Sequence, residues 1–235
     1  MNEASKTRRL WSATEAELLE GEGIDIGCGP DPISPEVKRF DLEDGDANEI
    51  GKFISRQFDF VFSAHCLEHM INPSQALLGW WKLVRPGGHL ILLVPDEDLY
   101  EQGYWPSLFN SDHRSSFTIA KQQSWSPRSF NVMDLMKQLP GSDVVSIKLH
   151  DFGYDRRFLQ PPVLPHRLAQ LLARHFGFAI KIGAQFNAAW LGKFLAWILR
   201  VPIDQTQQDA LAQIQAIVRK RRPEQSNQKI AAIDR

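Results

Sequence analysis

The segment Gly-Ile-Asp-Ile-Gly-Cys-Gly-Pro at residues 23–30 constrains this chain most, because it places an apolar strand directly before a glycine turn. Glycine has no Cβ, so Gly27 and Gly29 let the backbone turn sharply at the end of the strand and let a ligand lie against bare peptide groups. A turn of this kind is typical of a site for a nucleotide-like cofactor. We therefore expect an α/β fold with a ligand at this end of the strand.

The apolar pattern along the rest of the chain predicts alternating strands and helices. Residues 58–63 form a continuous apolar run that closes on Ser63, as expected for a strand buried on both faces. Helices are predicted over 11–20, 73–84 and 127–139, and further strands over 37–41, 89–95, 143–150 and 210–220, the last of them antiparallel. Residues 98–125 are aromatic and irregular, and we expect a long loop there.

Three segments resemble the class I S-adenosylmethionine-dependent methyltransferases, and in particular the subgroup called type 11. Asp25, Gly27 and Gly29 match the family's first motif, acid-x-Gly-x-Gly. Residues 64–69 resemble the type 11 segment after the fourth strand, and the Arg-Pro-Gly-Gly sequence at 85–88 matches the family's stop before the next strand. The resemblance implies a doubly wound, mostly parallel sheet of the seven-stranded type.

The chain departs from the family pattern in two places. Asp31, between Pro30 and Pro32, stands where a third glycine is usual, so we expect the helix after the turn to start late or to be short. The stretch from the glycine turn to Phe58 is also short, as if one strand-helix unit were trimmed. Asp41 and Asp46 both lie in this stretch, so either could take the place of the other at a ligand.

The resemblance implies S-adenosylmethionine as cofactor and a set of residues around it. The acid before the glycines would accept hydrogen bonds from loop amides or from the cofactor's amino group. Asp41 or Asp46, the two candidates in the trimmed stretch, would hold the ribose hydroxyls, and the Asp-Ala step at 46–47 would contact adenine. The predicted cofactor residues are Asp25, Gly27, Cys28, Gly29, Asp41, Asp46, Ala47, Ser63 and His65.

Methyl transfer to oxygen needs an in-line approach to the sulfonium methyl group and a base that takes the hydroxyl proton. His113 is our first candidate for that base, because imidazole titrates near neutral pH and this residue lies in the aromatic loop. Asp112 is expected to orient it or to bind substrate. His65 is the competing candidate, since it follows the predicted strand 58–63 directly.

Four further residues are candidates for contact with the acceptor: Tyr104, Trp105, Arg114 and Tyr154. The aromatic members of this set would stack on a sugar ring or simply wall the pocket. Glu68 and His69 resemble a pair of metal ligands, but no further ligand spacing supports a site, and we expect no metal.

Residues 163–201 contain no Asp or Glu, whereas they carry five Arg and Lys residues. Apolar side chains recur there at helical spacing and form two apolar faces. We interpret the segment either as a lid or dimer surface, or as a basic amphipathic surface for an anionic membrane. The predicted division is a core over 1–160, this insertion over 161–205, and the last strand with a tail over 206–235.

The net charge of −1 disfavours nucleic-acid substrates, and the two cysteines read as reduced core residues. No apolar run has the length of a signal peptide or a membrane span, so a cytoplasmic location is expected, with peripheral contact at the inner face of a membrane as an option. The leading hypothesis is O-methylation of a small-molecule or glycan hydroxyl, including a polysaccharide or glycolipid precursor. The alternatives are C-methylation of a lipophilic ring such as a quinone precursor, and a SAM-binding membrane scaffold without catalysis.

Overall fold

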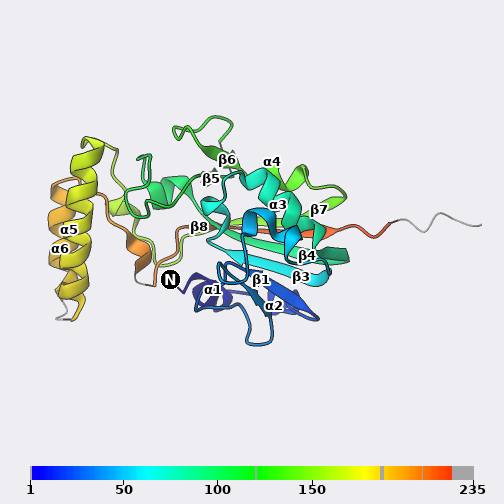
Figure 1. The fold of residues 1–235 in the computed structure, drawn as a ribbon. Helices are drawn as coiled ribbons and strands as arrows, with labels where there is room; N and C mark the ends of the chain where they lie inside the picture. The colour runs from blue at the N-terminus through cyan, green and yellow to red at the C-terminus, as the bar shows by residue number, and fades with distance from the viewer. Residues whose placement is uncertain (1, 120, 186–187, 208, 224–235) are drawn as a thin grey trace, which may run out of the picture.

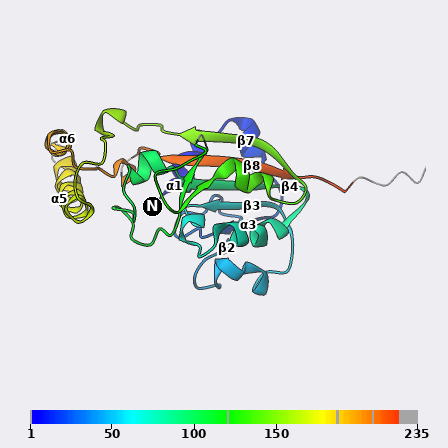
Figure 2. The same ribbon diagram turned by 90° about the horizontal axis from the view of Figure 1, so that it is seen from above.

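The computed structural model describes residues 2–119, 121–185, 188–207 and 209–223. A six-stranded sheet forms its centre, with the order β2-β1-β3-β4-β8-β7 (Figures 1 and 2). The first four strands in this order are parallel, and β8 runs antiparallel to both of its neighbours. The bounds are β1 Gly23–Ile26, β2 Lys38–Phe40, β3 Phe58–Ala64, β4 Val84–Pro95, β7 Ser142–His150 and β8 Gln213–Lys220. The predicted α/β fold and its closing antiparallel strand are confirmed.

Helices cover both faces of the sheet, and each face has its own apolar core. On one face lie α3, Pro73–Lys82, and α4, Val132–Lys137, whose apolar side chains pack with Phe58, Val61 and Leu92. On the other face lie α1, Glu3–Arg8, and α2, Ala13–Glu17. There Ala4 and neighbouring residues pack against Phe62 of β3. Both faces of β3 are therefore buried, as its apolar run predicts.

The chain between β1 and β3 is shorter than the family resemblance implies. Residues 27–37 form only turns, so the helix expected after the glycine turn is absent from this described stretch. Between β2 and β3 the only helix described is η1, a 3-10 helix at Ala47–Lys52, which agrees with a trimmed strand-helix unit. The unpredicted helix α1 lies beside the loop instead, and Asp31 accepts hydrogen bonds from the backbone and side chain of Ser5.

Two other boundaries differ from the prediction. β4 begins at Val84, because the Arg-Pro-Gly-Gly sequence forms an irregular start of the strand, with a register shift opposite Phe58 and Phe60. Gly88 is required there, since a Cβ would lie 2.4 Å from the carbonyl oxygen of Asp59. The range predicted as a helix, 127–139, contains the short strand β6 followed by the helix α4. The range expected to be a loop, 98–125, contains short elements. The additional elements are η2 Leu67–His69, η3 Glu97–Glu101, β5 Ser116–Thr118, β6 Ser129–Asn131, η4 Arg156–Phe158 and η5 Gln205–Gln207.

Residues 163–201 form two helices, α5 at His166–Gln185 and α6 at Ala189–Ile198, which pair with each other. Both helices stand beyond the end of the sheet at which the parallel strands finish (Figure 1). Gly192 permits the close pairing, because a Cβ there would lie 2.9 Å from Cγ1 of Ile180. None of the helices in the described ranges has the length and apolar character needed to span a membrane.

Candidate functional site

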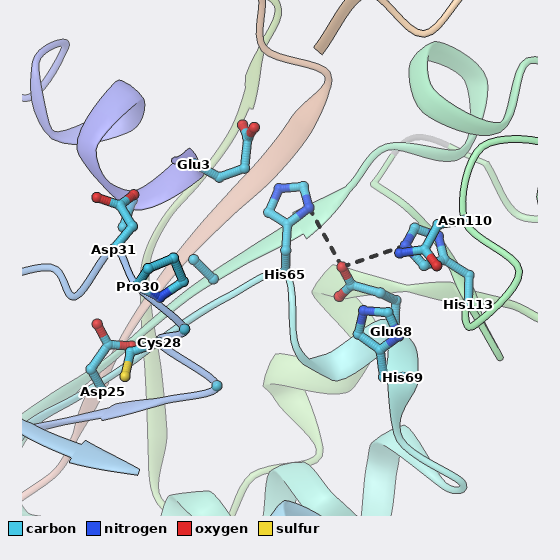
Figure 3. Close-up of a pocket in the computed structure, with 14 residues that line it drawn as sticks. Glu3, Asp25, Cys28, Pro30, Asp31, His65, Glu68, His69, Asn110 and His113 are labelled. Atoms are coloured by element: carbon cyan, nitrogen blue, oxygen red, sulfur yellow. Dashed lines mark ion pairs between the residues drawn. The ribbon is translucent and has the colours of Figure 1, made fainter. Parts of the chain in front are cut away.

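Two neighbouring cavities open at the carboxyl ends of the parallel strands, where an open α/β sheet binds its ligand. They share Gly27, His65 and His69 as lining residues, so they form adjacent parts of one cleft. The first cavity, drawn in Figure 3, is additionally lined by Glu3, Ala4, Asp25, Cys28, Gly29, Pro30, Asp31, Ala64, Glu68, Asn110 and His113. The second is lined by Phe40, Asp41, Leu42, Gly45, Asp46, Ala47, Asn48, Cys66 and Met70.

The glycine turn has the geometry that its sequence predicts. Gly27 has φ +73°, and a Cβ there would lie 2.6 Å from Cβ and Sγ of Cys66. The amide of Gly29 donates to Oδ2 of Asp41 at 2.6 Å, and the amide of Ile33 donates to Oδ2 of Asp25 at 2.8 Å. Asp25 thus holds a loop amide, as predicted, while burial raises its pKa to about 7. The turn leaves bare backbone facing the cleft.

The second cavity combines acids with apolar side chains. Asp41 and Asp46, the two predicted candidates for the ribose, both line it, next to Phe40 and Met70. Asp46 also caps η1 by accepting from the amide of Asn48 at 2.8 Å. An apolar slot edged by carboxylates suits a nucleoside, whose flat base and hydroxyl groups require both kinds of contact.

A buried carboxylate lies between two histidines in the first cavity (Figure 3). Oε1 of Glu68 is 3.5 Å from Nδ1 of His65 and 3.9 Å from Nε2 of His113. Glu68 is fully buried, and neither of its oxygens has a hydrogen-bond partner in the described structure. Burial raises its pKa to about 7, although His113 acts in the opposite direction. An unpartnered acid at this position is costly to bury, which indicates a functional role.

His113 is held by a carboxylate that our sequence reasoning missed. Nδ1 of His113 lies 2.7 Å from Oε1 of Glu101, and the imidazole stacks on the ring of Tyr100 with a centroid separation of 5.2 Å. Tyr100 and Glu101 belong to η3, which follows β4 directly. Their position after a strand that ends at the ligand edge of the sheet was the sequence feature that could have identified them. Burial lowers the pKa of His113, but the hydrogen bond to Glu101 and the charge of Glu68 outweigh it, so the net pKa is raised.

His65 lies in the same cleft, with its Nε2 2.7 Å from Oε1 of Gln213. Its φ of 51° places its backbone in the left-handed region, which residues other than glycine rarely adopt. Residues in such strained conformations are found more often at functional sites than elsewhere. Burial lowers the pKa of His65 to about 4, so this imidazole is neutral at neutral pH.

Two predicted residues have other roles in the structure. Asp112 is exposed, and in the described structure Glu101, not Asp112, is hydrogen-bonded to the His113 ring. Glu101 therefore takes the orienting position. The other expectation, that Asp112 binds substrate, stays a prediction. Ser63 is fully buried and donates its hydroxyl to the carbonyl of Ile26 at 2.9 Å, so it links two strands and does not line either cavity.

The four predicted acceptor contacts, Tyr104, Trp105, Arg114 and Tyr154, are not among the described lining residues of the two cavities. The Tyr104 hydroxyl accepts from the amide of Leu164 at 3.2 Å, and the Tyr154 hydroxyl donates to the carbonyl of Leu99 at 2.7 Å. Each tyrosine hydroxyl therefore links two segments that are distant in sequence. Arg114 is exposed, and its backbone amide donates to the Glu68 carbonyl.

The structure also brings together donor atoms that could hold a metal ion. Within the described ranges, one ligand atom each from Glu68, His69 and His113 lies within 4.8 Å of the others. Two imidazoles and a carboxylate are a donor set that transition metals accept. The same groups serve equally well in acid-base chemistry, and the expectation of a metal-free enzyme stays a prediction.

Residues 31–92 match the family model described as a methyltransferase domain, type 11. This match begins just after the glycine turn and covers β2, β3, α3 and most of β4. No curated protein matches the chain significantly. The matched segment contains the buried Glu68 and, apart from Gly27, the described residues that line the second cavity.

Among solved structures, the YcgJ protein of Bacillus subtilis is similar at 12% identity, covering 87% of this chain and 93% of that one, with a TM-score of 0.45. The plantazolicin methyltransferase BamL shares 12% identity over 92% of this chain and 84% of that one, with a TM-score of 0.45. A phosphoethanolamine N-methyltransferase of Haemonchus contortus shares 14% identity over 86% of this chain and 49% of that one, with a TM-score of 0.44. Likenesses at this level say nothing about the acceptor.

The family match, the order and direction of the strands, and the glycine turn at the end of β1 agree with one another. The segment 31–92 thus has the sequence pattern of a methyltransferase domain, a family that uses S-adenosylmethionine as its cofactor.

Proposed function

We propose that this enzyme transfers the methyl group of S-adenosylmethionine to a hydroxyl oxygen, with His113 as the base. The observation that carries the proposal is the placement of His113: buried at the first cavity, its Nδ1 is bound to Glu101, which leaves Nε2 directed towards Glu68. A histidine oriented through one ring nitrogen presents the other to a substrate proton.

The two cavities suggest how the cofactor would be held. The adenosyl portion fits the second cavity, where Ala47 and either Asp41 or Asp46 would contact it. The methionyl portion fits the backbone at Gly27 to Gly29, with Asp25 and Cys28 beside it. His65 lines both cavities and therefore marks the point where they meet. The bound sulfonium supplies the electrophilic methyl group and the leaving-group drive.

The protein's own part in the reaction is to position the acceptor and to move one proton. Bound S-adenosylmethionine would supply the methyl group and leave as S-adenosylhomocysteine, and Nε2 of His113 would take the hydroxyl proton. Glu101 and Glu68 then stabilise the imidazolium by hydrogen bonding and by charge. The raised pKa of His113 agrees with this role, since both carboxylates favour the protonated ring.

The buried polar groups favour an oxygen acceptor over the two alternatives. C-methylation of a lipophilic ring would suit an apolar cavity without a base, whereas this cavity contains His65, Glu68 and His113. A scaffold without catalysis would have no use for an unpartnered buried carboxylate beside an oriented imidazole.

A glycan or glycolipid at a membrane surface is the acceptor class that we propose. In α6, Trp190 is 67% exposed, Phe194 48% and Trp197 44%, so the helix presents large apolar side chains to its surroundings. Exposed apolar surface of this extent marks an interaction site, and together with the cations of 163–201 it suits an anionic membrane interface. A homodimer contact is the alternative for this surface.

Transfer of a radiolabelled methyl group to a panel of membrane-derived glycolipid and polysaccharide precursors tests the function. His113→Asn should abolish transfer while S-adenosylhomocysteine still binds, and His89→Asn, on β4 outside both cavities, is the matched control. Equal transfer by His113→Asn and the native enzyme would refute the role of the base.

Vesicle flotation tests the membrane contact separately. The native protein should float with anionic vesicles at low salt, and less so as salt rises. A Trp190→Ser, Phe194→Ser, Trp197→Ser variant should remain in the soluble fraction. Equal recovery of the native protein with and without vesicles would contradict the contact, and a change in oligomeric state in the variant would favour a dimer surface.

A further inference from the structure

A second groove, separate from the cofactor cleft, lies between α5 and the loop that carries His113. One wall is the face of α5, and the other is formed by residues of the 108–111 segment. Its lining residues are Leu108, Phe109, Ser111, Arg167, Gln170, Leu171, Ala173, Arg174, Gly177, Phe178, Lys181, Asp204 and Gln207. In Figure 1, α5 stands beyond the end of the sheet at which the cofactor cleft opens.

Three cations follow this groove at intervals of seven residues: Arg167, Arg174 and Lys181. Seven residues are almost two helical turns, so the three side chains project from one side of α5, about 10 Å apart along its axis. All three are exposed, and none forms an ion pair with another described residue. They therefore form a row of unpaired positive charge about 20 Å long.

Little negative charge opposes this row. Residues 163–201 contain no acid, and Asp204 is the only acid among the described lining residues. Oδ1 of Asp204 accepts from the amide of Thr206 at 2.9 Å and from its hydroxyl at 2.7 Å, so this oxygen is already engaged. The groove is thus net positive in a protein whose formal charge is −1.

The groove and the first cavity lie on either side of the segment 109–113, which carries His113. Phe109 and Ser111 line the groove, whereas Asn110 and His113 line the first cavity. One short segment therefore separates the two, and a long ligand lying in the groove would reach the base by passing this segment.

We propose that the groove binds the anionic part of an extended acceptor, an acidic glycan with carboxylate or phosphate groups along its length, while one of its hydroxyls reaches His113. The inference rests on the proposed O-methyl transfer and specifies its substrate class. The spacing of the cations favours a chain over a single phosphate, because one small anion cannot contact all three. The row also faces a groove walled by Leu108 and Phe109, whereas the exposed tryptophans that suit a membrane lie on α6.

Calorimetric titration of the full chain with polygalacturonate, and with neutral dextran of matched length, tests the proposal. Polygalacturonate should bind, more weakly as salt rises, and dextran should not. The triple variant Arg167→Ala, Arg174→Ala, Lys181→Ala should bind about tenfold more weakly, because three exposed ion pairs of modest strength are lost. A variant with Lys38, Lys82 and Lys137 each replaced by Ala has the same change in charge at exposed sites outside the groove and should bind like the native protein.

Two results would overturn the inference. Equal binding of polygalacturonate by the groove variant and the native protein would show that the row takes no part. Loss of anionic-vesicle binding in the groove variant, without any binding of soluble polygalacturonate by the native protein, would show that the row contacts lipid headgroups instead. Titration of every variant with S-adenosylhomocysteine keeps the cofactor site as a separate readout, so failure of the groove is distinguishable from failure of the proposed transfer.

Discussion

The substitution Glu68→Gln should stabilise the protein at alkaline pH while it impairs catalysis. Glu68 is fully buried, without a hydrogen-bond partner for either oxygen, and burial raises its pKa from 4.5 to about 7. A shift of this size corresponds to about 3 kcal/mol of lost stability once the group is ionised in both states. Glutamine keeps the shape, has no charge to bury, and can donate to His65 or His113.

The direction of this pH dependence of stability follows from the raised pKa of Glu68. Below the unfolded pKa of about 4.5 the acid is neutral in both states, so no free energy is lost to burying a charge. Between about pH 4.5 and 7 the carboxyl ionises in the unfolded chain but not in the native protein, so the native protein progressively loses stability that the glutamine variant keeps, and above about 7 the loss is complete. The variant's advantage should therefore grow from about zero at pH 4.5 to at most about 3 kcal/mol at pH 8, with the lost attraction between Glu68 and His113 reducing it.

Urea unfolding followed by tryptophan fluorescence at a series of pH values between 5 and 8 measures this difference. Glu17→Gln, at an exposed position of α2, is the control and should stay within about 0.5 kcal/mol of the native protein throughout. A difference that does not change with pH, or a glutamine variant less stable than the native protein at pH 8, would refute the reasoning.

Three further predictions concern the same site. The rate of methyl transfer should rise with pH, with an inflection above the ordinary histidine pKa of about 6.5. Glu101→Gln should move this inflection to lower pH, since Glu101 raises the pKa of His113. An unmoved inflection in the rate profile would contradict the assignment of His113 as the base. Removal of divalent ions by a chelator should leave the rate unchanged, whereas loss of activity that Zn²⁺ or Mn²⁺ restores in the native enzyme but not in His69→Ala would show a metal site. Tyr154→Phe should lower the free energy of unfolding by about 1 kcal/mol through loss of the hydrogen bond to Leu99 and leave the acceptor KM unchanged; a raised KM at native stability would restore Tyr154 as a substrate contact.

Local patterns predicted the parts of the fold that depend on neighbouring residues. The glycine turn follows from Gly27 and Gly29, β3 from its apolar run, and α3 from the helical spacing of Trp80 and its apolar neighbours. The helix expected after the turn was wrong because Pro30 and Pro32 do more than delay it. Residues before proline disfavour helical backbone, and the loop packs on α1 instead.

The proposed catalytic cluster around His113 depends on contacts between segments that are distant in sequence. Local patterns could indicate His113 and His65 as candidates, since each follows a strand or lies in the aromatic loop. They could not indicate that Glu101 binds His113, because this contact depends on how η3 folds back after β4. Asp112 is adjacent in sequence but exposed, and Glu101 is the carboxylate that binds the ring, so adjacency in sequence was a poor guide to the orienting carboxylate.

Binding of S-adenosylhomocysteine, measured by calorimetric titration, tests the central claim most directly. The native protein should bind in the micromolar range, Asp41→Ala should bind more weakly, and Gly27→Val should not bind, because its side chain would meet Cys66 at the turn. Gly51→Ala, where a Cβ has no neighbour within 4 Å, should bind like the native protein. Absence of binding by the native protein, or undiminished binding by Gly27→Val, would contradict a cofactor site at the end of β1.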